Sequence, residues 1–84
     1  MKPVLFSADA LKALKRQPRP LAQRLRDKVV AFATDPVSQA NNVKALRGRP
    51  GVVRLRVGDW RVILEDRGDV LVVIRIAPRG SVYD

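Results

Sequence analysis

A two-residue turn, Gly58-Asp59, fixes how the most regular part of this chain folds. Apolar and polar side chains alternate from Val53 to Val57 and again after Trp60. This alternation is typical of β-strands, and a two-residue loop that begins with glycine joins two antiparallel strands in a tight hairpin. Such a loop also sets the register, because a shift of one residue would exchange the two faces of the strands.

The register predicted from this turn divides the hairpin into an apolar face and a basic face. The apolar face must receive the rest of the core and consists of Val53, Leu55, Val57, Trp60, Val62 and Leu64. The other face carries Arg54, Arg56 and Arg61, with Arg56 directly opposite Arg61. Like charges that face each other across two strands are destabilising. The three arginines therefore favour a site for a polyanion, although a solvated face whose charges prevent aggregation is the structural alternative.

Composition supports a polyanionic partner. The 84 residues include 17 Lys and Arg against 8 Asp and Glu, a formal net charge of +9. A field of this sign favours nucleic acid, an anionic membrane or an acidic protein, while a basic surface kept for solubility is the other reading. No apolar run is long enough to span a bilayer and the start of the chain is unlike a secretory signal, so a cytoplasmic location is expected.

The residue types that are missing restrict the chemistry. The chain contains no cysteine, which excludes disulfides, thiolate metal sites and a thiol nucleophile. It also contains no histidine, and so lacks the usual general base near neutral pH and the commonest metal ligand. We expect no cofactor and no metal site.

The remaining segments predict an α+β fold. A strand over Val4–Phe6 is followed by a helix capped by Ser7 and, after Pro18 and Pro20, by a second helix that ends at Asp35-Pro36. Residues 37–51 are interpreted as a connection with a short helical turn, and residues 70–76 as a central strand. One domain, residues 1–84, is expected: an N-terminal strand, a helical hairpin and a three-stranded antiparallel meander, with the helices on one face of a four-stranded twisted sheet.

The segment from Val43 to Asp84 resembles the C-terminal half of the RelE/ParE superfamily, the toxins of bacterial type II toxin–antitoxin systems. The likeness lies in the sequence "LRG", the basic alternating strand, the "GDWR" hairpin, the acidic turn "DRGD", the apolar strand, and the Arg and Tyr near the end. The order of the first strand and the helices extends it to nearly the whole chain. The resemblance implies that a cognate antitoxin holds the toxin inactive in a hetero-oligomer.

The RelE-like branch of this superfamily cuts messenger RNA on the ribosome without a metal. The resemblance carries the site of these endoribonucleases, as catalytic residues, onto Arg54, Arg56, Arg61, Arg79 and Tyr83. The implied reaction is attack of a ribose 2′-hydroxyl on the adjacent phosphorus. The arginines would stabilise the phosphate, and Tyr83 would accept a proton or stack on a base. Lys44, Arg47 and Arg49 are predicted to extend the RNA-binding surface.

Several alternatives stay open at this level. Many RelE-like enzymes have lysines at the positions of Arg54 and Arg56, and arginine does not release its proton, so these positions leave cleavage itself in question. The sequence is equally consistent with Arg79 as a surface charge and Tyr83 as a packed ring. A ParE-like inhibitor of DNA gyrase without nuclease activity, and a non-catalytic RNA- or ribosome-binding module, are the competing functions.

Overall fold

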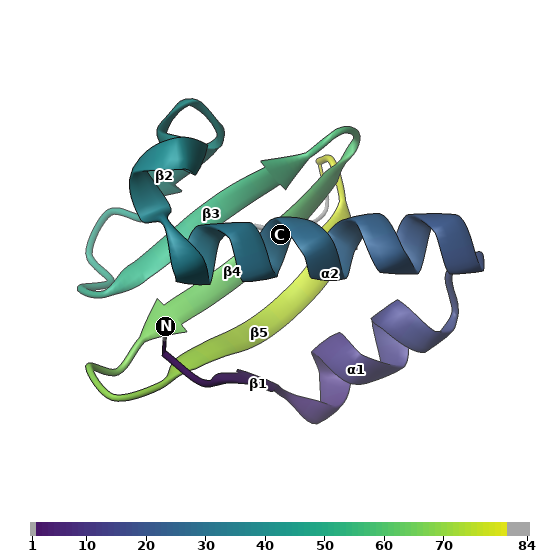
Figure 1. The fold of residues 1–84 in the computed structure, drawn as a ribbon, viewed down its shortest axis with the longest axis horizontal. Helices are drawn as coiled ribbons and strands as arrows, with labels where there is room; N and C mark the ends of the chain where they lie inside the picture. Colours follow the sequence, from purple (N-terminus) through teal and green to yellow (C-terminus); the bar gives the residue numbers. More distant parts are fainter. Residues whose placement is uncertain (1, 81–84) are drawn as a thin grey trace.

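The computed structural model describes residues 2–80, which form a five-stranded sheet covered on one face by two helices (Figure 1). Along the chain the elements are β1 (Val4–Phe6), α1 (Ala8–Lys15), α2 (Arg19–Thr34), the 3-10 helix η1 (Pro36–Asn42), β2 (Val43–Ala45), β3 (Val52–Val57), β4 (Trp60–Asp66) and β5 (Leu71–Pro78). The strand order in the sheet is β1-β5-β4-β3-β2. The predicted α+β class, helical hairpin and final meander are confirmed.

The predicted sheet was wrong in its number of strands. It has five strands rather than four, because residues 43–45 pair antiparallel with β3. It is mixed, since β1 runs parallel to β5 while the other neighbours are antiparallel. The middle strand is β4, and β5 lies beside it as an inner strand. A strand of three residues carries no periodic signal of its own, and β2 forms because β3 offers it a free edge.

Ser7 links the end of β1 to the start of α1. Its hydroxyl accepts a hydrogen bond from the Ala10 amide at 3.1 Å and donates to the Ile74 carbonyl at 2.6 Å. Ile74 is the extra residue of a β-bulge, because Ile63 pairs with Arg75 whereas Leu64 pairs with Val73. The parallel pairing of β1 with β5 ends at Val73, so one serine caps the helix and binds the bulge where the ladder stops.

The second helix crosses the sheet with one apolar stripe inward. Leu25 and Val29 are fully buried, while Leu21 and Phe32 of the same stripe are partly buried against the core. The helix begins with Pro20 in its first turn and ends at Thr34, with Asp35 as its C-cap before Pro36. Among residues 2–80, no helix has the length and apolar character needed to cross a membrane.

The hairpin register predicted from the turn is confirmed. Val57 pairs with Trp60, and Arg56 pairs with Arg61. The apolar face of the hairpin meets the helices in one cluster of buried residues, which are Ala10, Leu14, Leu25, Val29, Leu55, Val57, Val62, Leu64, Leu71, Val73 and Ile76. The face away from the helices was predicted to be basic. It also carries a smaller apolar cluster of Val52, Ile63 and Ala77.

Candidate functional site

The arginines of β3 and β4 meet at the turn end of the hairpin. Gly58 has φ +60° and no other described residue of this turn has a positive φ, which agrees with a tight turn that begins with glycine. The register places Arg56 opposite Arg61, and Lys44 of β2 opposite Arg54 of β3. Three neighbouring strands therefore contribute cationic side chains to the same end of the sheet.

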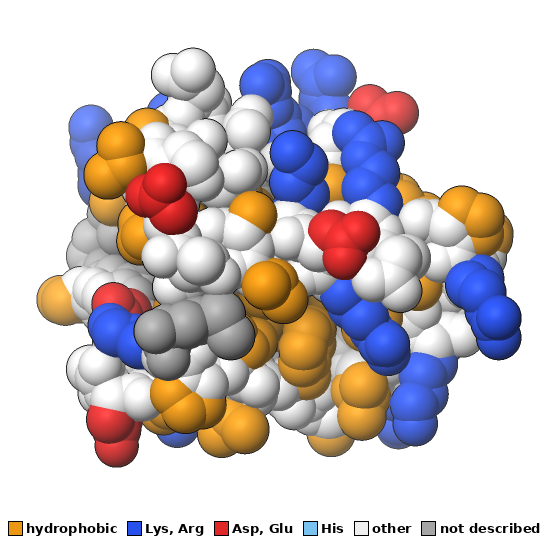
Figure 2. All heavy atoms as spheres, in the orientation of Figure 1, with side chains coloured by type: hydrophobic (Ala, Val, Ile, Leu, Met, Phe, Trp, Pro, Cys, Tyr) orange, Lys and Arg blue, Asp and Glu red, His pale blue; other side chains and the backbone are white. Residues whose placement is uncertain are grey.

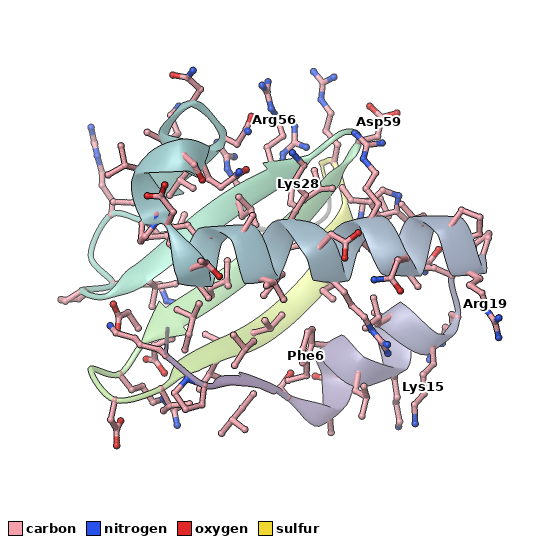
Figure 3. All side chains as sticks on the ribbon, in the orientation of Figure 1. Phe6, Lys15, Arg19, Lys28, Arg56 and Asp59 are labelled. Carbon is pink, nitrogen blue, oxygen red and sulfur yellow. The ribbon has the colours of Figure 1, made fainter. Side chains whose placement is uncertain are left out.

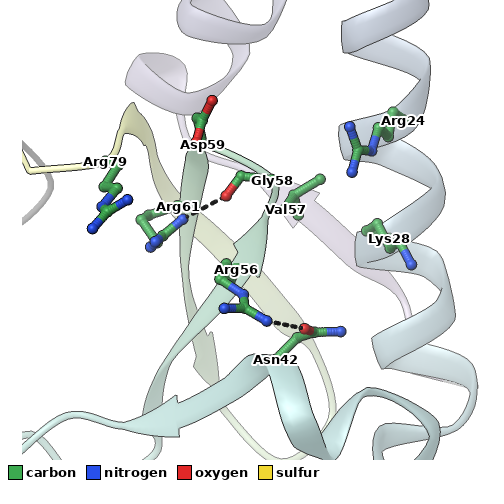
Figure 4. A pocket seen from close by; sticks show the side chains of 9 residues that line it. All are labelled: Arg24, Lys28, Asn42, Arg56, Val57, Gly58, Asp59, Arg61 and Arg79. Carbon is green, nitrogen blue, oxygen red and sulfur yellow. Dashed lines mark hydrogen bonds between the residues drawn. The ribbon is translucent and has the colours of Figure 1, made fainter.

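Two adjoining hollows open among these side chains. The first, of about 470 Å³, lies beside the β3–β4 turn and is called the turn hollow (Figure 4). The second, of about 300 Å³, lies beside β2 and is called the strand hollow. Asn42, Arg56 and Arg61 line both. The turn hollow adds the cations Arg24, Lys28 and Arg79, and the strand hollow adds Lys44 and Arg54.

Hydrogen bonds to the backbone hold Arg61 in place. Its Nη1 donates to the Gly58 carbonyl and to the Trp60 carbonyl, both at 2.9 Å. Arg61 is partly buried, and Arg56 beside it donates from Nη2 to the Asn42 side-chain oxygen at 3.2 Å (Figure 4). The turn and the end of η1 thus orient two guanidinium groups without neutralising them.

The last strand brings Arg79 to the same place. The amide of Arg79 donates to the Asp59 carbonyl at 2.7 Å, which ties the end of β5 to the hairpin turn. Trp60 pairs with Pro78, one residue before Arg79. This contact explains why a residue 18 positions after Arg61 in sequence lines the turn hollow with it.

The far side of the turn hollow is formed by α2. Arg24 and Lys28 are separated by four residues and so lie on one face of the helix, across the hollow from Arg56 and Arg61 (Figure 4). The guanidinium of Arg24 lies over the turn: a Cβ built on Gly58 would be 3.4 Å from both of its terminal nitrogens. Lys28 is partly buried, whereas Arg24 is exposed.

Carboxylates are scarce around the hollows. Asp59 lines the turn hollow, but its side chain points away from Arg56 and Arg61 (Figure 4). The ion pairs Lys2–Asp66 and Arg67–Glu65, both with 2.5 Å between nitrogen and oxygen, lie at the other end of β4. Figure 2 shows Lys and Arg side chains gathered along the upper and right edges of this face, with a few Asp or Glu side chains among them.

Asp66 titrates differently because of its partners. The hydrogen bond from Lys2, and then the backbone amide of Gly68 at 2.9 Å, lower the pKa of this carboxyl below its ordinary value. Asp66 lies five positions after Arg61, a distance of about 17 Å along β4. Asp66 therefore lies at the end of β4 that is far from the β3–β4 turn, and its charge does not act on the hollows.

The structure brings most of the predicted site residues together. Arg54, Arg56, Arg61, Arg79 and Lys44 line the two hollows. Arg47 and Arg49 do not line either hollow, because they lie in the exposed loop between β2 and β3. Tyr83 lies outside the described residues.

Sequence reasoning assigned no role to several residues that line the hollows, among them Arg24, Lys28 and Asn42. Arg24 and Lys28 belong to the predicted second helix, and Asn42 to the predicted connection. A signal was present for the first two, because like charges four residues apart destabilise a helix without a compensating partner.

Among residues 2–80, no group of three or more carboxylates lies close enough to hold a metal ion.

Comparison with known proteins identifies the family of this chain. A family model described as the ParE toxin of the type II toxin–antitoxin system parDE matches residues 4–83. The chain belongs to this family. Toxin RelE3 of Methanocaldococcus jannaschii is 29% identical over 85 residues, covering 96% of this chain and 94% of that toxin. This ParE-family chain is thus a RelE-like member of the RelE/ParE superfamily, as its sequence suggested.

Solved structures of RelE toxins share the fold of this family member. The RelB–RelE antitoxin–toxin complex from Methanococcus jannaschii aligns with a TM-score of 0.75 and 25% identity over 95% of both chains. The archaeal RelE–RelB complex from Pyrococcus horikoshii OT3 gives 0.77 and 26%, over 95% of this chain and 97% of that one. The isolated E. coli RelE toxin, 24% identical, has the same fold with a TM-score of 0.76, over 99% of this chain and 92% of that one.

Proposed function

We propose that this toxin is an endoribonuclease that cuts messenger RNA on the ribosome, and that Arg54, Arg56, Arg61 and Arg79 form its site with Tyr83. The observation that carries the proposal is the arrangement of these four arginines around two adjoining hollows with few carboxylates near them. Nothing in the packing of the sheet needs this gathering of like charge. A ligand with several phosphates would compensate it.

The proposed reaction is an internal transfer at phosphorus. The ribose 2′-oxygen forms a bond to the adjacent phosphorus while the bond from phosphorus to the 5′-oxygen breaks. The 2′-hydroxyl gives its proton to a base, and the leaving 5′-oxygen takes up a proton. The products are a 2′,3′-cyclic phosphate and a free 5′-hydroxyl, so no water, metal or cofactor enters the balance.

The arginines suit the electrostatic part of this reaction. Negative charge builds up on the non-bridging phosphate oxygens, and each guanidinium offers a planar pair of N–H donors to two oxygens. Arg61 is held by two backbone carbonyls through Nη1, and its remaining N–H groups have no partner among residues 2–80. Donors fixed before the substrate arrives need no rearrangement during the reaction.

Proton transfer needs another group, because arginine keeps its proton. Tyr83 is the candidate, either as the proton acceptor or as a surface on which an unstacked base lies. The Tyr83→Phe variant separates these two roles, since phenylalanine retains the ring and loses only the hydroxyl. Loss of cleavage with unchanged RNA affinity indicates proton transfer, and retained cleavage indicates stacking.

A cognate antitoxin is the proposed protein partner. The structures from M. jannaschii and P. horikoshii are complexes of RelE with RelB, and this chain shares their fold at 25% and 26% identity. An antitoxin would bind the toxin in a hetero-oligomer and compensate its charge of +9. Both the antitoxin and the ribosome place this function in the cytoplasm.

The matched family model also favours a second candidate. The model describes ParE toxins, and the resemblance of this chain to them implies that it inhibits DNA gyrase and has no nuclease activity. Both candidates are toxins, so arrest of growth does not distinguish them. Cleavage of messenger RNA distinguishes them, because only the endoribonuclease cuts it.

The test is induced expression of the chain without antitoxin, followed by mapping of messenger RNA ends. Cleavage within coding regions that disappears in Arg61→Ala supports the endoribonuclease. Intact RNA together with inhibited supercoiling by gyrase would favour the second candidate. Intact RNA, active gyrase and retained ribosome binding would leave a non-catalytic binding module.

A further inference from the structure

The cationic pair on α2 has no role in the proposed chemistry, yet it faces the site. Arg24 and Lys28 lie four residues apart on α2, where like charges destabilise a helix. Asp27, the nearest carboxylate in the helix sequence, accepts a hydrogen bond from Gln23 at 2.8 Å, and among residues 2–80 it forms no ion pair with Arg24 or Lys28. The fold retains a repulsive pair at the side of a hollow.

Arg24 contacts the hairpin turn, and Lys28 lines the hollow beside it. The Arg24 guanidinium lies against Gly58, where a Cβ would come within 3.4 Å of it. Lys28 is partly buried and, in Figure 3, lies on the same side of the molecule as Arg56. The turn hollow is thus lined by cations from α2 on one side and by Arg56, Arg61 and Arg79 on the other.

We infer that Arg24 and Lys28 bind a second phosphate of the RNA chain, next to the phosphate held by the arginines of the sheet. This inference rests on RNA being the proposed substrate. It makes the α2 side of the turn hollow, formed by Arg24 and Lys28, a second phosphate-binding wall that the sheet residues do not provide. The chain of cations from Lys44 through Arg56 to Arg24 crosses both hollows, which share Asn42, Arg56 and Arg61. A single phosphate would occupy only part of this length, whereas a single-stranded backbone follows it.

A binding wall has a kinetic signature different from that of a catalytic group. Arg24 and Lys28 contact a phosphate whose charge is the same in the substrate and in the transition state. Their loss therefore raises KM and leaves kcat unchanged, whereas loss of Arg61 lowers kcat. The inference concerns substrate affinity, and it can be measured without cleavage.

The experiment measures binding of a single-stranded RNA oligonucleotide that is 2′-O-methylated at every ribose and so cannot be cut by internal attack. Arg24→Ala/Lys28→Ala is compared with wild type and with Lys12→Ala/Arg16→Ala. The control removes the same two charges from Lys12 of α1 and from Arg16, the C-cap of that helix, which are also four residues apart and line a different hollow. The expected result is about tenfold weaker binding for the α2 variant, with a slope of log K against log salt reduced by about 0.7, the value for one phosphate of a single strand.

A scan of the RNA locates the phosphate. Each phosphate in turn is replaced by an uncharged methylphosphonate. We expect one position at which neutralisation weakens wild type but not the Arg24→Ala/Lys28→Ala variant. The corresponding glutamine variant, Arg24→Gln/Lys28→Gln, keeps the side-chain stems and gives the same result if the effect is due to charge.

The possible outcomes separate this inference from the proposed nuclease. Weaker binding in the α2 variant alone supports the second wall even if wild type cuts no messenger RNA. Equal losses in the α1 and α2 variants would overturn it, because net charge would then explain the affinity. Unchanged RNA binding with weakened antitoxin binding would overturn it as well and assign this wall to the protein partner.

Discussion

Arg56 and Arg61 lie directly opposite each other across the β3–β4 hairpin, and both line the same two hollows. Neither forms an ion pair with a carboxylate among residues 2–80. Arg56 binds the side chain of Asn42, and Arg61 binds carbonyls of the turn. The hairpin therefore keeps two positive charges together and oriented, at a cost to its own stability.

Replacing Arg56 by glutamine is expected to stabilise the protein and weaken its function. Removal of a repulsive cross-strand pair contributes about 0.2–1 kcal/mol to the free energy of unfolding. The gain is larger at low salt, because salt screens the repulsion in wild type. Urea unfolding at two salt concentrations measures it, with Arg47→Gln in the exposed loop as the control. Lower stability of Arg56→Gln at low salt would show that the pair is not repulsive.

The hairpin register was predictable because two independent signals agree on it. A two-residue turn that begins with glycine and an apolar face on each strand allow the same pairing and no other. The grouping of Arg54, Arg56 and Arg61 follows from that register alone. Arg79 and Lys44 were also predicted, but their place does not follow from this register: a hydrogen bond from the Arg79 amide to the Asp59 carbonyl and the pairing of β2 with β3 bring them to the hollows.

Other parts of the site and fold depend on packing between segments distant in sequence, which no local sequence pattern predicts. β2 has three residues, and its pairing is set by the free edge of β3. The parallel pairing of β1 with β5 joins segments more than 60 residues apart. The position of α2 over the turn, which brings Arg24 to Gly58, follows from the burial of Leu25 and Val29.

Gly58→Ala tests the turn and its contact with α2. Gly58 has φ +60°, which costs about 1–2 kcal/mol for a residue with a side chain, and its new Cβ would crowd the Arg24 guanidinium. Gly48→Ala is the matched control, since φ is +70° there but no atom lies within 4 Å of the added Cβ. Both variants should lose stability in thermal unfolding, whereas only Gly58→Ala should lose RNA affinity. Equal affinities would show that the Arg24 contact does not position a binding group.

Ser7→Ala is expected to destabilise the protein by about 1–2 kcal/mol. The change removes the cap of α1 and leaves the Ile74 carbonyl at the bulge without its 2.6 Å partner. For a domain of this size, the loss corresponds to a fall of about 4–16 °C in the melting temperature. Ser38→Ala removes an exposed serine hydroxyl that contacts only nearby residues in η1, and it should change the melting temperature little. Equal effects of the two changes would contradict the role assigned to Ser7.

The Lys2–Asp66 pair predicts a pH dependence of stability. Because the pKa of Asp66 is lowered in the folded chain, its carboxylate stabilises the fold above the pKa of the unfolded state, about 3.9. This contribution disappears as the pH falls through the folded value. Asp66→Asn should therefore melt below wild type at pH 7, and the difference should shrink as the pH falls below about 4. Lys2→Gln in the same background should add little, because its main partner is already absent.

The central claim is that the arginines gathered at the hairpin turn catalyse cleavage of messenger RNA by internal attack. The direct measurement is the chemistry of the RNA ends after the purified toxin acts on translating ribosomes. The account predicts 2′,3′-cyclic phosphates and 5′-hydroxyls within the coding region, with the rate lowered about 10²–10³-fold in Arg61→Ala and unchanged in Arg47→Ala. Messenger RNA that stays intact with wild type, or that is cut equally fast by Arg61→Ala, would contradict it.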